Sequence, residues 1–412
     1  MNTPLIILML AFAVPATIEA QVEPAATGPT RIGIRGILNY SARTSQATEM
    51  YGDTRGNEVE AILSGDLGYA TGSEKNPFSM NFSGGYNWAL SGINYGTGPY
   101  ENLMISQGFI GRNGSLVLTD NLGYHKQSPL TGFSGEPGTG ESIGGSGTTT
   151  TPGESILTLN TRTIDNSASA TWSHRFGTVT LSSGGSGMIL RYPDGNGNGS
   201  NQIAANAGVS ERLNARNTLS EQYMFTTYSY LDSNISFDSN SVLFGYTRQW
   251  TRNIQSTLSA GPQWVMSGSE SVSYSSIGMS VSGTVTDKLR SGSASLTGSH
   301  GFDGGGGYMY GSKSDQISGA FSHGFGKKLT VEFTGGWRQN NWVTSSGVIE
   351  SKFGASQLSG KLGRHFSWDA SYTGTVQSSS GSVPTNVLSS LWQVISFGIS
   401  FNPAPVHLRG VL

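Results

Sequence analysis

The sequence predicts an all-β fold, a transmembrane antiparallel β-barrel of about 16–18 strands with short periplasmic turns and long extracellular loops. Three observations predict it. Apolar and polar residues alternate over strand-length segments, short basic separators alternate with long Gly-rich ones, and the composition is poor in both apolar and charged residues.

The composition is unusual for an ordinary soluble domain. Only 35% of the residues are hydrophobic and 12% are charged, whereas soluble domains have about 45–50% and 25%. Low apolar content is also typical of disordered chains, but a chain that is 10% aromatic rarely belongs to them. The net charge of −2 gives no indication of nucleic-acid binding. The absence of Cys excludes disulfides and thiolate metal sites.

The N-terminal segment is typical of a secretory signal. An apolar run from Leu5 to Val14 is followed by small residues up to Ala20, which predicts a signal peptide over residues 1–20. A membrane anchor is the alternative, although this run is too short to span a bilayer as a helix. We expect a short polar lead-in over residues 21–30, the barrel over residues 31–402 and a C-terminal tail over residues 403–412.

A period of two runs through residues 329–338 and recurs in most other segments, as in a strand with one apolar and one polar face. In a soluble sandwich the apolar face would point to a core, whereas in a membrane barrel it faces lipid and the polar face lines the lumen. The signal peptide and the asymmetry of the separators favour the membrane. Parity then predicts these pore-lining residues: Thr330, Glu332, Thr334, Arg338, Asp369 and Gln255.

The separators set the strand count. We count eight short ones, such as residues 324–328, and nine that are mostly longer, such as residues 128–154. With the N-terminus on the side of the short turns, these counts give about eighteen strands. Aromatic residues cluster near the short turns, and we expect them to form an interfacial girdle.

The second half resembles a group of poorly characterised bacterial outer-membrane β-barrel proteins. The resemblance depends on residues 241–263 (SVLFGYTRQWTRNIQSTLSAGPQ), 310–315 (YGSKSD), 322–330 (SHGFGKKLT) and 394–401 (VISFGISF). The last of these also looks like the C-terminal strand that barrel assembly machinery reads. The resemblance implies a porin-like barrel in outer-membrane lipid, and some similar proteins are associated with exopolysaccharide export. It implies no catalytic residue and no cofactor.

Ser–His pairs are the only candidates for catalysis. His174, His300 and His323 each follow a Ser, and a hydrolase needs a nucleophile beside its general base. Adjacent residues on a strand point to opposite faces, so such pairs do not easily meet. His174 and His323 also occupy equivalent turn positions. We therefore expect no enzyme activity.

One segment resembles half of a calcium loop. Residues 194–199, DGNGNG, match the start of an EF-hand loop, with Asp194, Asn196 and Asn198 as candidate ligands. The position that should supply the bidentate Glu is Ala205, so a polar loop tip is the favoured interpretation. We expect no other metal and no cofactor.

The long separator 128–154 is the third on the loop side. In general porins the third loop folds inwards, and by analogy of position Glu136 and Glu141 would lie near a constriction. A surface loop is the alternative.

A barrel of this size has room for an aqueous channel. The leading hypothesis is a passive porin-like channel for small polar solutes in the bacterial outer membrane. The alternatives are an accessory barrel of exopolysaccharide export, with polysaccharide as its partner, and a structural barrel with a closed lumen. The sequence leaves the solute and the oligomeric state open.

Overall fold

The computed structural model describes residues 35–51, 57–71, 73–92, 97–126, 162–195, 199–231, 233–268, 274–303, 310–326, 328–383, 391–404 and 406–409. These residues hold no helix that is long and apolar enough to cross a membrane. They form nineteen strands in one sheet. The strands are β1 (Arg35–Tyr51), β2 (Asn57–Thr71), β3 (Phe78–Gly92), β4 (Gly98–Ile110), β5 (Gly114–Lys126), β6 (Arg162–Phe176), β7 (Val179–Arg191), β8 (Ser200–Arg212), β9 (Asn217–Tyr230), β10 (Ser236–Gln249), β11 (Ile254–Ser267), β12 (Ser275–Leu289), β13 (Gly292–Asp303), β14 (Ser312–Phe325), β15 (Leu329–Trp342), β16 (Val348–Lys361), β17 (Phe366–Ser380), β18 (Leu391–Phe401) and β19 (Val406–Arg409).

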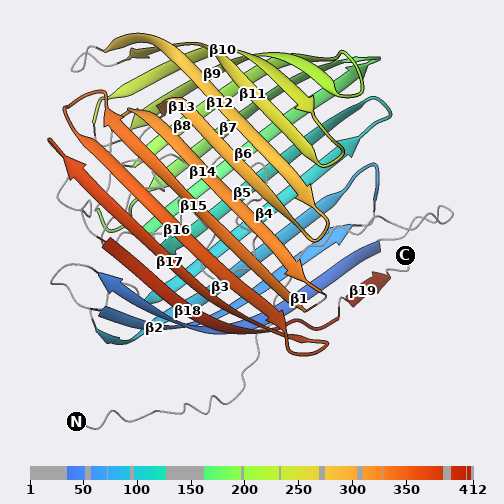
Figure 1. Ribbon diagram of the computed structural model, residues 1–412, viewed down its shortest axis with the longest axis vertical. Helices are drawn as coiled ribbons and strands as arrows, with labels where there is room; N and C mark the ends of the chain where they lie inside the picture. Colours follow the sequence, from blue (N-terminus) through green and yellow to red (C-terminus); the bar gives the residue numbers. More distant parts are fainter. Residues whose placement is uncertain are drawn as a thin grey trace.

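The sheet closes on itself. Each strand from β1 to β17 pairs antiparallel with the next, and β1 pairs with β18 from Ala42↔Phe401 to Tyr51↔Trp392 (Figure 1). The short β19 adds four pairs to the beginning of β1. The molecule is therefore a closed antiparallel barrel of eighteen strands, which confirms the predicted fold class. Closure gives every barrel strand a hydrogen-bonded neighbour on both sides, so none of the eighteen is an edge strand.

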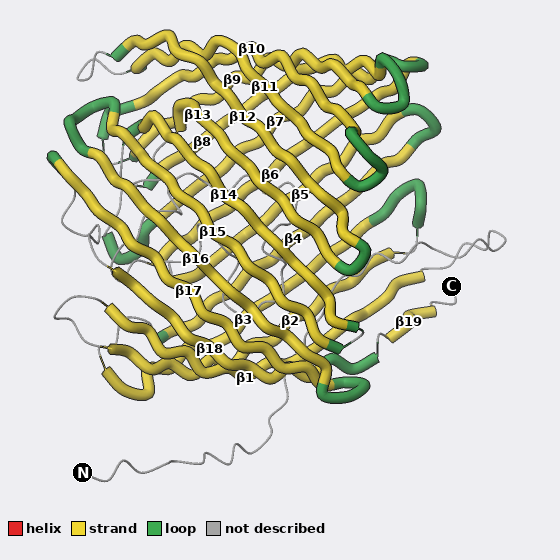
Figure 2. The backbone as a smooth tube through the Cα atoms, viewed as in Figure 1, coloured by secondary structure: helices red, strands yellow, loops and turns green. Residues whose placement is uncertain are grey.

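The two ends of the barrel differ. Eight short connections join β2 to β3, β4 to β5 and so on to β16 and β17, and we call their end the turn side (Figure 2). β1 begins and β18 ends on this side, and the opposite end is the loop side. Gly177 and Gly326 occupy two of the tight turns with φ of 62° and 70°. Glycine adopts such positive φ values without steric cost.

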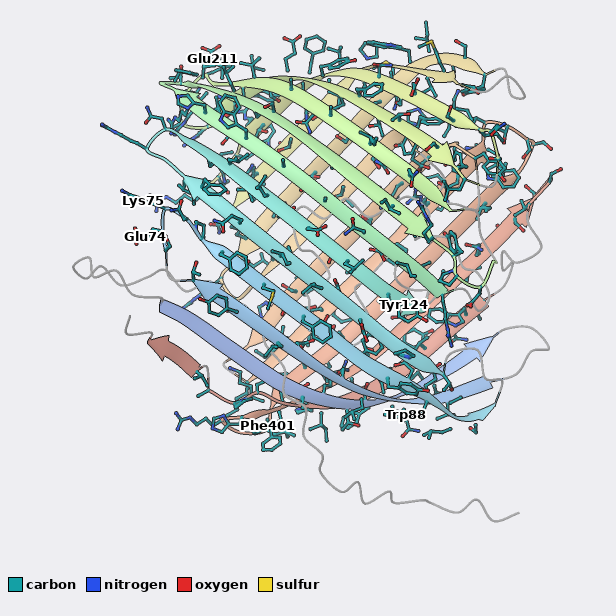
Figure 3. All side chains as sticks on the ribbon, turned by 180° about the vertical axis from the view of Figure 1, so that it is seen from behind. Glu74, Lys75, Trp88, Tyr124, Glu211 and Phe401 are labelled. Atoms are coloured by element: carbon teal, nitrogen blue, oxygen red, sulfur yellow. The ribbon has the colours of Figure 1, made fainter. Side chains whose placement is uncertain are left out.

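The two faces of the barrel wall also differ. Outward side chains are large, apolar and exposed, among them Ile203, Phe244 and Leu258 at 59%, 58% and 56%. Exposed aromatic residues gather at the turn side, including Phe176 and Phe325. Figure 3 shows the outward layer from behind, with Glu74 and Lys75 at the turn end. None of the described residues forms a layer over this apolar surface, which fits a wall that faces lipid.

The seam between the first and last barrel strands carries an ion pair on the inner face. Arg43 of β1 donates to Asp369 of β17 over 2.7 Å, and both side chains are about nine-tenths buried. Between them lies Gly398 of β18, the register partner of Asp369. A Cβ on Gly398 would come within 2.6 Å of the guanidinium. The missing side chain is therefore what lets Arg43 reach across a whole strand.

Candidate functional site: the lumen and its loop-side end

The inner wall is polar and open to solvent over part of its length. Gln255 of β11, Ser282 of β12 and Ser299 of β13 lie on the inner face, opposite in parity to exposed apolar residues of the same strands, and all three are exposed. Because the barrel is closed, exposed inward side chains indicate a lumen with space for water.

An apolar cluster crosses this lumen at the loop side. We call it the first cluster: Leu190 and Tyr192 from the end of β7 and Ile349 from the start of β16, with Met188, Trp342 and Val383 packed against them. β7 and β16 are nine places apart in a ring of eighteen strands, so they lie on opposite walls. Contact between these side chains therefore narrows the loop-side mouth.

A second cluster fills the neighbouring part of the mouth. Its buried members are Tyr230 of β9, Phe237 of β10 and Val265 of β11. Phe302 of β13 packs on Phe237 with ring centroids 5.6 Å apart, and Tyr310 packs on Tyr230 at 5.0 Å. The end of β13 at Phe302 and the residues before β14 at Tyr310 therefore lie inwards, past β12, against the inner wall of β9–β11. We call Phe302, Asp303 and residues 310–312 the inward-reaching segment.

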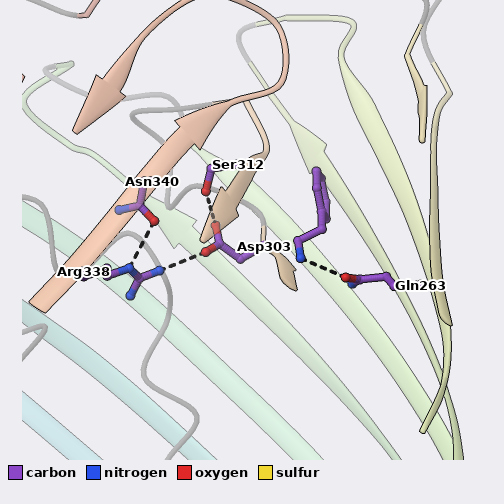
Figure 4. Close-up of polar contacts among 6 residues, drawn as sticks. Gln263, Asp303, Ser312, Arg338 and Asn340 are labelled. Carbon is purple, nitrogen blue, oxygen red and sulfur yellow. Dashed lines mark hydrogen bonds and ion pairs between the residues drawn. The ribbon is translucent and has the colours of Figure 1, made fainter. Parts of the chain in front are cut away.

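A polar network holds this inward-reaching segment (Figure 4). Arg338 of β15 donates to Asp303 over 2.9 Å and to Asn340 over 3.1 Å, and Ser312 donates to Asp303 over 2.6 Å. The side chains of Arg338 and Asp303 are 6% and 11% exposed. Two buried charges of opposite sign, each with further hydrogen bonds, satisfy each other.

Gln263 of β11 binds the end of β13 from the side opposite to Arg338. Its Oε1 accepts the backbone N–H of Phe302 over 2.9 Å, and its Nε2 donates to Ser239 of β10 over 3.0 Å. The hydroxyl of Tyr230 accepts the backbone N–H of Gly311 over 3.0 Å. The pairing of β12 with β13 ends at Val281↔His300. Side chains therefore replace the backbone ladder where β13 leaves β12.

The predicted pore-lining residues lie on three strands, β11, β15 and β17. Thr330, Glu332 and Thr334 share the face of β15 that carries Arg338. Arg338 belongs to the mouth network and Asp369 to the seam pair, whereas Gln255 is exposed on β11. The structure thus does not bring the six together in one place. Their contact with a solute stays a prediction.

Other predicted positions lie outside the described residues. These are Glu136 and Glu141 of the expected constriction loop and Asn196 and Asn198 of the calcium candidate. Asp194 lies in the turn after β7. The described residues contain no group of three His, Asp or Glu side chains placed to hold a metal.

The adjacent Ser and His side chains of β6 separate as the strand geometry requires. Ser173 bonds the hydroxyl of Ser115 over 2.9 Å on the inner face. His174 stacks on Trp172 and packs at a tilt against Phe176 on the outer face. The pair therefore does not form a nucleophile and base.

Sequence reasoning missed the residues of the mouth. Leu190, Phe237, Val265 and Ile349 are apolar residues at inward positions of strands whose other inward residues are mostly polar. All four lie near the loop-side ends of their strands. An apolar residue at a position where the alternation calls for a polar one was therefore the sequence signal that could have indicated the mouth residues.

These features define the class of protein. A closed barrel with an apolar exposed outer face and a polar inner face is the architecture of β-barrels that cross outer membranes. No family model matches the sequence, and no curated protein matches it.

Several solved outer-membrane structures are similar in shape. OccK2 (OpdF) of Pseudomonas aeruginosa is 10% identical with a TM-score of 0.49, over 91% of this chain and 98% of that one. A BenF-like porin from Pseudomonas fluorescens Pf-5 is 11% identical with a TM-score of 0.49, over 90% and 99%. OpdK of P. aeruginosa is 10% identical with a TM-score of 0.47, over 90% and 99%. Because these identities and TM-scores are low, the assignment to outer-membrane β-barrels depends on the closed barrel, its apolar outer face and its polar inner face.

Proposed function

We propose that the protein is a passive channel for small polar solutes in the bacterial outer membrane. The observation that carries the proposal is the presence of exposed polar side chains, such as Gln255 and Ser299, on the inner face of a closed barrel. Solutes cross such a lumen by diffusion, and no catalytic group or cofactor takes part.

The mouth gives this channel a narrow point. The first and second clusters and the Arg338–Asp303 network lie at the loop side, whereas inward residues such as Gln255 and Lys288 towards the turn side are exposed. In this proposal a solute meets the narrowing at one end and a wider vestibule at the other. The short turns face the periplasm, as is usual for outer-membrane barrels.

The apolar outer face of the barrel determines that the protein is surrounded by membrane lipid in this proposal. Membrane lipid covers the exposed belt of Ile203, Phe244 and Leu258, and barrel assembly machinery inserts the strand that ends at Phe401. Small polar solutes are then the only partners that the lumen requires. The link to exopolysaccharide export, which the resemblance implies, stays a prediction.

Conductance tests the proposal directly. Purified protein refolded into a planar lipid bilayer is expected to give stable conductance steps in KCl. A matched preparation of the heat-unfolded chain serves as the control. Folded protein with a β-type circular dichroism spectrum that gives no steps would overturn the proposal.

The first cluster favours a second candidate, a structural barrel with a closed lumen. Leu190 and Ile349 already bring opposite walls into contact. If this contact closes the mouth, the wild type is silent, and the double variant Leu190→Ser with Ile349→Ser restores conductance. If the wild type conducts, the closed barrel is excluded.

A further inference from the structure

Two inner walls of the barrel carry ladders of hydroxyl groups. On β12 and β13 three register pairs follow one another: Ser282↔Ser299, Thr284↔Thr297 and Thr286↔Ser295. The neighbouring outward positions hold exposed Val285 and Leu296, so these six residues lie on the inner face. Thr284 and Thr297 bond each other over 3.3 Å. We call this surface the hydroxyl wall.

A second surface of the same chemistry lies opposite. On the inner face of β5 and β6, Ser115 bonds Ser173 over 2.9 Å and Thr119 bonds Ser169 over 2.5 Å. The inward pair between them is Val117↔Thr171, so five of these six inward side chains carry a hydroxyl. β5 and β13 are eight places apart in the ring of eighteen. The two surfaces therefore face each other across the lumen.

Hydroxyl pairs can still bind a solute. Each hydroxyl has one donor and two acceptor sites, so one bond to its cross-strand partner leaves further sites for a third group. Ser282 and Ser299 are exposed, which leaves them accessible from the lumen. A hydroxyl group of the solute can thus replace a hydrogen bond to water with a similar hydrogen bond to the hydroxyl wall.

The charged groups described near these walls do not favour ions of one sign. Arg43 is paired with Asp369, and Arg338 is paired with Asp303. Lys288 is exposed on the inner face of β12, one inward position beyond Thr286, and it repels cations. Glu332 of β15 lies beside Ser322 of β14, and its carboxylate repels anions while it accepts hydrogen bonds from neutral hydroxyls. An ion that enters loses hydration and gains no opposite charge from the hydroxyl wall.

We propose that the lumen selects neutral polyhydroxylated solutes, such as sugars and sugar alcohols, over ions of similar size, through the facing hydroxyl ladders of β12–β13 and β5–β6. This inference rests on the proposed channel function and names its substrate class.

Solute influx into proteoliposomes tests it. Wild-type protein is expected to admit glucose faster than gluconate or glucosamine, which have the same number of carbons and carry one charge. The double variant Thr284→Val with Thr297→Val keeps the side-chain volumes and removes two hydroxyls. Its glucose influx is expected to fall about threefold or more, because the variant loses two hydroxyl groups that can bond to a passing solute. Its KCl conductance stays within twofold of wild type. Thr44→Val, the same change on the outer face of β1, is the control.

The outcomes separate the two proposals. Equal influx of the three solutes through a conducting barrel would overturn the substrate class and leave the channel intact. Unchanged glucose influx in the double variant, with heat-modifiable mobility showing that it is folded, would also overturn it. Absence of KCl conductance in folded wild type would overturn the channel, and the substrate class with it.

Discussion

Removing one partner of the mouth ion pair should destabilise the barrel strongly. Arg338 and Asp303 are joined over 2.9 Å with side chains 6% and 11% exposed. Arg338→Met removes the guanidinium from the buried Asp303 carboxylate, which keeps the hydrogen bond from the Ser312 hydroxyl. Loss of one member of a buried pair costs about 3–5 kcal/mol. That is a large part of a typical total stability of about 5–15 kcal/mol.

The double variant should recover most of this loss. Arg338→Met combined with Asp303→Asn removes both charges, and neutral replacements of a buried pair are often close to neutral in stability. Urea unfolding in lipid vesicles, followed by tryptophan fluorescence, measures the four free energies of unfolding of the cycle. We expect a coupling free energy of about 2 kcal/mol or more.

An exposed pair provides the control. Lys352 and Glu350 are 3.0 Å apart on the outer face of β16, with side chains 65% and 37% exposed. Lys352→Met should leave the unfolding midpoint unchanged, since exposed pairs contribute little. Single mouth variants as stable as Lys352→Met, with no coupling between them, would refute the reasoning.

Two further changes test the faces and the seam. Leu258→Arg places a charge on the lipid face and should impair insertion, at up to about 2–4 kcal/mol for a midplane position. Gln255→Arg, on the inner face of the same strand, should fold and shift channel selectivity towards anions. Impaired folding of Gln255→Arg with normal folding of Leu258→Arg would show that the faces are misassigned. Gly398→Ala should displace the Arg43 guanidinium and lower stability by about 1–3 kcal/mol in urea titrations. Gly354→Ala, where a Cβ meets nothing within 4 Å, should not, and equal effects would contradict the steric argument.

The sequence predicted the barrel because its determinants are local. The hairpin of β14 and β15 illustrates this: Phe321 and Phe333 alternate with polar neighbours, and the turn between the strands contains Gly326. The alternation of apolar and polar residues shows which side chains share a face, and the turns show where one strand ends and the next begins. The number of strands and the face on which each residue lies therefore follow from local sequence. The structure has eighteen barrel strands, at the upper end of the predicted range.

The mouth could not be predicted in the same way. The contact of Leu190 with the group around Ile349 joins opposite walls, and no local pattern specifies which strands meet across a ring. Gln263 bonds a backbone group of Phe302, and neither residue type indicates such a bond. Apolar residues at inward positions marked the strand ends involved, but not their partners. The sequence-based constriction, with Glu136 and Glu141, lies outside the described residues and stays a prediction.

The Arg43–Asp369 ion pair can form only late in folding, when the barrel closes. Its two members are 326 residues apart in sequence, and β1 finds its second neighbour only when β18 is present. Such long-range pairings slow folding, because a large loop must be closed before they form. Until that moment β1 has an open edge that can pair with another chain. Among the barrel strands, β1 therefore carries an unpaired edge for the longest part of chain synthesis, because its second neighbour is the last barrel strand.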